Sequence, residues 1–321
     1  MGRRSASFSQ GETEMRLNDL LLFLVVCVSI GFAIIRPDIC EPLQPYPLYL
    51  MMFLLFLSFL RINFDSLLDT SMRSFIQVGI LAFVKLFVLP VALYGITAVV
   101  WPEFALPVLL LSGISTGVVA PFVANMVNTD VAPVLRMVVA TSLLTPFTLP
   151  ALVELLVGAE ANIPVAPMIR MLAMVIFIPL GLVAIARRTI PGLLEKLNVF
   201  QFPISLVLFG LINLAVFSRY SKFFFQNWET LLAAIVISYL LAIIYYATGF
   251  IVSRSGVPGE RLSAGISMAI VNNVLIIVFS SQFFGPLAPT LAAVYMFPFF
   301  SLLAPLKLLS LRFKWLAPSR G

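Results

Sequence analysis

The chain has 321 residues, of which 61% are hydrophobic and 11% are charged, and its mean hydropathy is +1.08. Soluble globular proteins average about 45–50% apolar and about 25% charged residues, so a soluble protein is excluded. Apolar stretches long enough to cross a lipid bilayer recur along the chain. There is no histidine, and the spacing of Cys27 and Cys40 matches no zinc site. We therefore expect a membrane protein that is not an enzyme and holds no metal or cofactor.

The net charge of +6 does not indicate a nucleic-acid partner, because the charges lie at the ends of apolar segments and form no basic face. Residues 1–19 are polar, and no cleavage motif of small residues follows the first apolar run, so a cytoplasmic tail is predicted instead of a signal peptide. Ten membrane spans are predicted, at residues 20–35, 47–62, 76–100, 105–127, 131–157, 165–186, 201–217, 228–253, 261–281 and 288–310.

The basic residues predict the orientation of these spans, because Lys and Arg are retained in cytoplasmic loops. With the N-terminus inside, fifteen basic residues fall on the inner side, and four fall outside, at Arg36, Arg170, Arg219 and Lys222. The remaining one, Lys85, lies inside a span. We expect a multi-pass protein of the inner or cell membrane, with both termini in the cytoplasm.

Each half of the chain contains an odd number of predicted spans, so the two halves would have opposite orientations, as in transporters with inverted repeats. The predicted organisation is a tail at 1–19, a five-helix repeat at 20–160, an inverted five-helix repeat at 161–310, and a cytoplasmic tail at 311–321.

The fourth and ninth spans share an unusual content of small and polar residues, and both contain Gly-Ile-Ser, at 113–115 and 265–267. Broken helices at matching places in inverted halves indicate a transport site. The alternative is that small residues only let helices pack closely. This alternative is weakest for the adjacent asparagines Asn272 and Asn273, whose side-chain amides have many hydrogen-bonding positions to satisfy. The candidate substrate-binding residues in these spans are Ser115, Thr116, Pro121, Asn125, Ser267, Asn272 and Asn273.

Three stretches resemble the bile acid:sodium symporter family: residues 79–100 with Pro90, residues 125–156 with the Asp130 turn, and residues 261–281 with their continuation to 305. The chain is similar to a divergent prokaryotic-type member. The resemblance implies an all-α transmembrane fold of ten helices in two inverted repeats, with a panel of spans one, two, six and seven. The other spans would form a core, in which broken helices four and nine cross, and substrate would bind between core and panel.

The resemblance also implies departures from the sodium-coupled members. On helix nine, Ser267 occupies the place of a Glu, and Val271 that of a Gln. The Ser-Asn pair expected at the break of helix four is Ala120-Pro121, whereas Thr141 and Ser142 match hydroxyl positions on helix five. A Gln of helix three is replaced by Lys85. The usual sodium ligands are therefore absent.

Lys85 lies about nine residues into its span, or about 14 Å deep at about 1.5 Å per residue. A lysine at that depth is costly unless it is paired, hydrated or able to snorkel. We expect Lys85 to point at the helix crossing and to replace the coupling sodium as a tethered charge. The groups expected to hold it are freed backbone carbonyls and the side chains of Thr141, Ser142, Ser267 and Asn272.

The predicted function is secondary transport of a small organic anion by alternating access, not coupled to sodium in the usual way. Lys85 is also a candidate proton carrier and, because it would attract an anion, a candidate substrate-binding residue. One alternative is an auxin-efflux-carrier-like transporter, since Pro121 is predicted at the crossing. Another is a non-transporting receptor or scaffold that retains the fold. For Lys85 itself, the alternative is that its side chain only snorkels to the lipid headgroups and has no role in function.

Overall fold

The computed structural model describes residues 21, 24–60, 72–127, 129–161, 164–256, 258–302 and 305–306. The tails predicted at 1–19 and 311–321 lie outside these residues. The described chain consists of helices and their connections, with one isolated antiparallel bridge. The all-helical class expected from the sequence is confirmed.

Apolar segments and proline positions account for the helix boundaries in the first half of the chain. Several helices begin with proline, whose missing N–H is not needed in the first turn. The elements are a helix at Leu24–Ile35, α2 Pro37–Cys40, η1 Glu41–Leu43, α3 Pro47–Leu60, α5 Met72–Phe83, the π-helical turn η2 Val84–Val88, α6 Leu89–Val100, α7 Pro102–Gly113, α8 Ala120–Met126 and α9 Val131–Ala161.

The second half has α10 Val165–Thr189, α11 Pro191–Val199, α12 Gln201–Phe217, η3 Ser218–Tyr220, α13 Ser221–Gln226, α14 Trp228–Val252, α15 Pro258–Ala269, α16 Asn273–Phe283, α17 Leu287–Val294 and α18 Met296–Ser301. Two segments expected to contain breaks are interrupted: α7 is separated from α8, and α15 from α16.

Five of the described helices are long and apolar enough to cross a membrane, at 72–100, 131–158, 165–189, 201–226 and 228–252. A sixth span is added if Pro37–Leu43 and Pro47–Leu60, which meet at 67°, form one bent span. The other apolar helices are shorter, at 24–35, 102–113, 273–283 and 287–301. The two interruptions divide the fourth and ninth expected spans into pieces, the second is bent, and the described helices of the first and tenth, at 24–35 and 287–301, are shorter than a full span.

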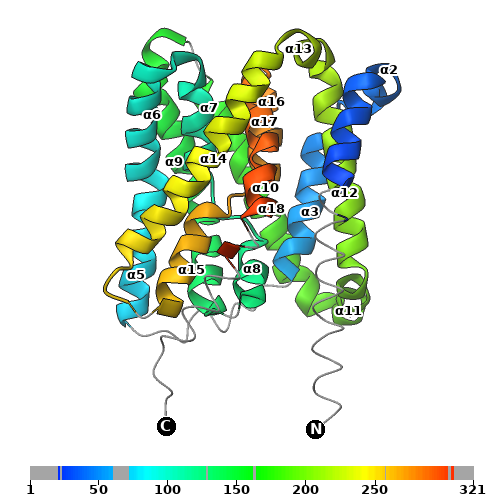
Figure 1. The fold of residues 1–321 in the computed structure, drawn as a ribbon. Helices are drawn as coiled ribbons and strands as arrows, with labels where there is room; N and C mark the ends of the chain where they lie inside the picture. Colours follow the sequence, from blue (N-terminus) through cyan, green and yellow to red (C-terminus); the bar gives the residue numbers. More distant parts are fainter. Residues whose placement is uncertain are drawn as a thin grey trace.

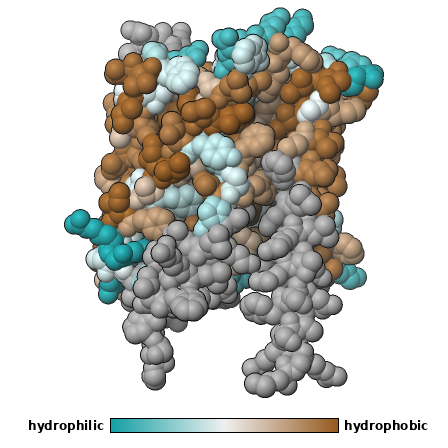
Figure 2. Space-filling view, in the orientation of Figure 1, coloured by the Kyte–Doolittle hydropathy of each residue, from teal (hydrophilic) through white to brown (hydrophobic). Residues whose placement is uncertain are grey.

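Figure 1 shows α3, α11 and α12 on one side of the molecule and α5, α6 and α7 on the other, with α16 and α17 between them. α3 packs against α10 and α12, whereas α7 packs against α6, α9 and α17. In Figure 2, apolar residues cover much of the visible face, with a weakly hydrophilic patch near its centre, and the most hydrophilic residues lie towards the two ends. This distribution is that of a protein embedded in a bilayer.

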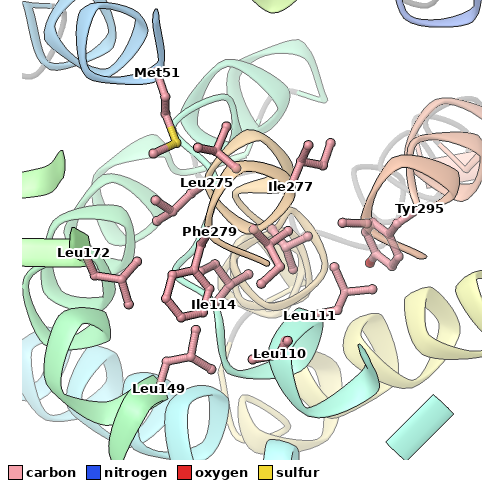
Figure 3. Close-up of a cluster of buried hydrophobic side chains, with 14 of the residues drawn as sticks. Met51, Leu110, Leu111, Ile114, Leu149, Leu172, Leu275, Ile277, Phe279 and Tyr295 are labelled. Atoms are coloured by element: carbon pink, nitrogen blue, oxygen red, sulfur yellow. The ribbon is translucent and has the colours of Figure 1, made fainter. Parts of the chain in front are cut away.

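The apolar core is built around α16, as Figure 3 shows. Leu275, Ile277 and Phe279 of α16 are fully or almost fully buried. Their neighbours in the buried cluster come from other helices, including Met51 of α3 and Leu172 of α10. The interrupted helix α15–α16 is therefore enclosed by protein over its second half, so its break does not expose backbone to lipid.

Close packing also fixes α15 against α14. A Cβ atom at Gly249 of α14 would lie 2.6 Å from the carbonyl oxygen of Ala264 and 2.6 Å from the Cα of Gly265. Only glycine permits this approach of two backbones. The contact places Tyr245, one turn before Gly249, beside the C-terminal half of α15.

Candidate functional site

Two interrupted helices meet at the centre of the molecule. The chain between α7 and α8, residues 114–119, runs antiparallel to the chain between α15 and α16, residues 270–272. The amide of Gly117 donates to the carbonyl oxygen of Ile270 at 2.8 Å, and the amide of Asn272 donates to that of Ser115 at 3.0 Å. In Figure 1, α7 and α16 lie towards one end of the molecule, and α8 and α15 towards the other. The interrupted backbones thus satisfy part of each other's hydrogen bonding.

Gly117 is required by this crossing. A Cβ atom at that position would lie 2.6 Å from the carbonyl oxygen of Val271 and 3.0 Å from its carbonyl carbon. Backbone atoms cannot move away without breaking the bridge between Thr116 and Val271. The glycine is therefore explained by a close approach of two backbones.

The last carbonyl groups of an α-helix have no partner within the helix, and at the end of α15 four of them are bound by groups from other segments. The hydroxyl of Thr116 donates to the carbonyl of Ser267 at 2.8 Å. The remaining three carbonyls, those of Met268, Ala269 and Ile270, accept from the Lys85 ammonium at 2.7 Å, the Tyr295 hydroxyl at 2.8 Å and the Gly117 amide at 2.8 Å, respectively.

Lys85 reaches this helix end from a π-helical turn. Residues Val84–Val88 form the turn, and the amide of Leu89 bonds to the carbonyl of Val84. Pro90 follows directly, and because proline has no N–H and its ring crowds the carbonyl four residues earlier, it disturbs the regular helix here. The local irregularity thus has an identifiable cause in the sequence.

The Lys85 side chain is 1% exposed, and its Nζ atom lies 5.9 Å from the ring centroid of Tyr245. Among the described residues it has no carboxylate partner. Its charge is stabilised instead by the C-terminal end of α15, where helix dipoles place negative partial charge, and by the face of an aromatic ring.

Helix α9 supports the crossing from one side. The hydroxyl of Thr141 accepts from the amide of Thr116 at 2.9 Å and donates to the carbonyl of Met137 at 2.6 Å. The neighbouring hydroxyl of Ser142 and that of Ser115 are buried without a partner in the described part of the chain. No group of three or more His, Cys, Asp or Glu side chains there could hold a metal ion.

A cavity of about 620 Å³ lies on another side of the crossing. Its walls come from α3, α8, α9, α12, α16 and α18, together with the two chain interruptions. The described lining contains no charged side chain. It is mostly apolar, with polar side chains at Ser58, Asn125, Gln201, Ser205, Asn272 and Asn273. Such a lining suits a ligand with a large apolar part and a few polar groups.

The two adjacent asparagines have different roles. Asn272 caps α16, because its side-chain oxygen accepts from the amide of Leu275 at 3.3 Å. The Nδ2 group of Asn273 contacts the sulfur of Met296 at 2.8 Å, and its Oδ1 atom has no partner among the described residues. The N-terminal end of α16 therefore opens on the cavity with both amides beside it.

The residues singled out from the sequence fall into two groups. Pro121, Asn125, Asn272 and Asn273 line the cavity. Lys85, Ser115, Thr116 and Ser267 are buried in or against the crossing, and none of them is among the described residues of the lining.

The contacts of Lys85 also differ in part from those expected. Its ammonium is held by a freed backbone carbonyl, as expected, but the hydrogen bond goes to Met268 and not to the side chains of Thr141, Ser142, Ser267 or Asn272. The hydroxyl of Ser267 instead donates to Ser263 within its own helix, at 2.8 Å.

The expected position of the first break requires a correction. Ala120 and Pro121 do not form it, since they begin α8. The interruption lies earlier, at residues 114–119, because Ser115 and Gly117 pair with the second interrupted chain. Asp130 caps the next helix, because its side chain accepts from the amide of Ala132 at 3.0 Å, at the start of α9.

Two residues near the centre were not identified from the sequence. The hydroxyl of Tyr295 donates to the carbonyl of Ala269, and Gln201, the first residue of α12, lines the cavity. Gln201 is an amide at the edge of a predicted span, which is a weak signal by itself. Tyr295 carries no signal, because aromatic residues are common throughout this chain.

Comparison with protein families finds a match to the model of the Sodium Bile acid symporter family over residues 48–227. The match covers more than half of the chain. It includes Lys85 and the interruption between α7 and α8, and it ends before α15. No match was found among curated proteins.

Proposed function

The chain belongs to the sodium bile acid symporter family, and we propose that it is a secondary transporter of a small organic anion that does not use sodium in the usual way. The apolar helices and the family support a membrane transporter of the bile acid symporter type. The substrate, the coupling and the mechanism are the proposed part. The observation that carries the proposal is Lys85, whose buried ammonium occupies the freed end of α15 at the crossing.

The proposed architecture is two inverted five-helix repeats, with a panel and a core. Two arrangements support it. The interrupted helices run in opposite directions through the centre, and the cavity lies between their crossing and helices α3 and α12. In this proposal α3, α10, α12 and the helix at 24–35 form the panel. Movement of the core against the panel would open the cavity to one side of the membrane at a time.

Lys85 is proposed to act as a tethered cation. A bound cation near the crossing would be stabilised by freed carbonyls, and the ammonium of Lys85 already binds one of them. The oxygen of Thr141 is engaged by the amide of Thr116, and that of Asn272 by the amide of Leu275. With a permanent charge in place, a coupling sodium is not needed. A Lys85 that exchanges its proton during transport is the second form of this proposal.

The support for an anionic substrate comes from the N-terminal end of α16, which lines the cavity. Lys85 gives no direct support, because it is not among the described residues of the lining. Asn272, Asn273 and Val274 line the cavity at the start of α16, where the helix dipole is positive. The described lining offers no carboxylate that would repel an anion. The large apolar part of the lining would hold the hydrocarbon portion of the substrate.

Two other functions remain as proposals with specific support. An auxin-efflux-carrier-like transporter is favoured by Pro121, which begins α8 and lines the cavity. A non-transporting receptor or scaffold is favoured by the absence of the family's usual sodium ligands, inferred from the resemblance. Both would retain the crossing.

The test is to purify the protein, reconstitute it in liposomes and screen organic anions for thermal stabilisation and uptake, with sodium or with potassium as the only cation. We expect uptake of some anions that is equal in the two salts. Strong stabilisation by sodium alone would contradict the tethered-cation proposal. Failure of every anion to bind or move would favour the receptor or scaffold.

A further inference from the structure

A second hollow, a groove of about 480 Å³, lies on the surface of the molecule where α11 meets α12. One wall is a face of α11 with Leu193, Lys196 and Leu197, which the helical spacing of three and four residues brings together. The other wall is the first half of α12, with Ile204 and Val207. Lys196 is the only charged side chain of the described lining, and the others are apolar. None of these residues lines the cavity beside the helix crossing.

The apolar side chains of this groove are exposed. Leu193 is 52% exposed, Phe200 between the two helices 60%, and Val207 62%. In a protein embedded in a bilayer, exposed apolar side chains face the hydrocarbon of the lipids. A groove between two helices contacts a hydrocarbon chain on two sides, whereas the convex surface of a single helix contacts it on one. The groove therefore offers one acyl chain more contact than the surface around it.

The position of the groove along the molecule places its charged end near the lipid headgroups. Figure 1 shows α11 at the same end of the molecule as α8 and α15, whereas α12 runs along its length. Helix α10 ends with Arg187 and Arg188 just before α11 begins, and basic residues at the end of an apolar helix mark the membrane interface. From Phe200 to Val207 the groove follows α12 towards the membrane interior for about 10 Å, at about 1.5 Å per residue.

The charge at the interfacial end is positive. Lys196 is exposed, and within the described part of the chain it has no ion-pair partner. Arg188, at the junction from which α11 starts, is exposed as well. Its acidic neighbour in the chain, Glu195, is not part of the lining. A lysine beside an apolar groove at the level of the headgroups suits a lipid that carries a negative charge.

We propose that this groove binds one acyl chain of an anionic phospholipid, whose phosphate group lies against the ammonium of Lys196. A zwitterionic lipid, or an apolar helix of a second copy of the chain, would fill the groove without using the lysine. The bound lipid braces the junction of α11 and α12, and α12 belongs to the proposed panel. The site is separate from the candidate substrate cavity, and the inference does not depend on transport.

The experiment compares two lipids with the same acyl chains. Full-length protein in detergent, freed of copurified lipid, is titrated with palmitoyl-oleoyl phosphatidylglycerol or with palmitoyl-oleoyl phosphatidylcholine. Native mass spectrometry counts the bound lipid, and thermal shift measures the stabilisation. In low salt the wild-type protein should bind the anionic lipid about fivefold more tightly, the factor expected from one basic residue at a membrane surface. The preference should shrink in high salt, which screens exposed charges.

The charge is tested at Lys196. In Lys196→Gln the anionic lipid should lose about fivefold in affinity and bind like the zwitterionic one, whereas Lys196→Arg should keep the preference. Because the side chain is exposed, neither change should impair folding. Lys222→Gln is the matched control, since Lys222 is an exposed lysine of α13, at the opposite end of the molecule. It should behave like the wild type.

The apolar part of the groove is tested by filling it. Val207→Trp places a large side chain in the groove, and both lipids should bind more weakly. Val236→Trp, at a position 55% exposed in α14 and outside the described lining, is the control for adding an exposed tryptophan. It should leave the binding of both lipids unchanged.

Equal affinities of the two lipids for the wild-type protein, or a preference that survives in Lys196→Gln, would overturn the proposal. A third contrary result is a Val207→Trp protein that binds lipid like the wild type while a dimer of the wild type becomes monomeric. The groove would then be an interface between two copies of the chain. None of these results bears on the transporter proposal, which is tested by uptake.

Discussion

The ammonium of Lys85 lies 2.7 Å from the backbone carbonyl oxygen of Met268, which joins a π-helical turn of one segment to the interrupted end of another 183 residues away. The lysine is buried, and the described residues provide no carboxylate to neutralise it. Ionisable groups in such positions are costly to a membrane protein. The cost is consistent with a charge retained for function.

The first prediction separates a functional charge from a structural one by replacing Lys85 with methionine. Lys85→Met removes the cost of burying an ammonium, several kcal/mol, and leaves the carbonyl of Met268 unpaired, at about 1–3 kcal/mol. We expect the variant to be at least as stable as the wild type to heat in detergent and to have lost transport. Lys222→Met, at an exposed position, is the control and should leave both unchanged. Unaltered uptake by Lys85→Met would show that the lysine is only structural.

The second prediction concerns the crossing itself. In Gly117→Ala the new methyl group would lie 2.6 Å from the carbonyl oxygen of Val271, which forces the two interrupted chains apart. We expect a loss of at least about 1–3 kcal/mol of stability, with two backbone hydrogen bonds weakened. Gly95→Ala is the matched control, since nothing lies within 4 Å of its Cβ position in α6. It should be neutral or stabilising by up to about 1 kcal/mol. Equal melting temperatures for the two variants would contradict the close approach at Gly117.

The third prediction tests the hydrogen bond by which Tyr295 binds a free carbonyl at the C-terminal end of α15. Tyr295→Phe removes the hydroxyl that donates to the carbonyl of Ala269 at 2.8 Å and keeps the ring. Because both groups are buried, the unpaired carbonyl should cost about 1–3 kcal/mol, seen as a lower melting temperature. Tyr49→Phe, at a position 65% exposed in α3, should melt like the wild type. A Tyr295→Phe protein as stable as that control would mean that another donor reaches the carbonyl.

The fourth prediction concerns orientation, which rests on the distribution of Lys and Arg. A reporter fused after Gly321 should be active only as a cytoplasmic fusion, because fifteen basic residues fall on the side assigned to both termini and four on the other. The measurement compares a reporter that functions in the cytoplasm with one that functions outside the membrane. Activity of the external reporter would invert the predicted topology.

The sequence was sufficient for the long apolar helices and for the segments that would be interrupted, but not for short helices such as α11. Uninterrupted apolar segments bounded by proline predict helices well, because helix hydrogen bonds are local and lipid excludes other structures. The segment expected at 201–217, for instance, is α12 with the same bounds. Small and polar residues within two apolar segments likewise pointed to the interruptions, since broken helices are tolerated there only where protein satisfies the backbone.

Only the tertiary structure decided what each central side chain contacts. From the sequence, Lys85 was expected beside freed backbone carbonyls and side-chain oxygens and within reach of the substrate. In the structure it binds one such carbonyl, that of Met268, and it lies away from the described lining of the cavity. The positions of Gln201 at the cavity and of Tyr295 at the end of α15 were likewise found only in the structure. Periodicity and composition report on neighbours along a helix, whereas these contacts join segments far apart in the chain. Which carbonyl is freed, and which donor reaches it, depends on how the interrupted helices cross.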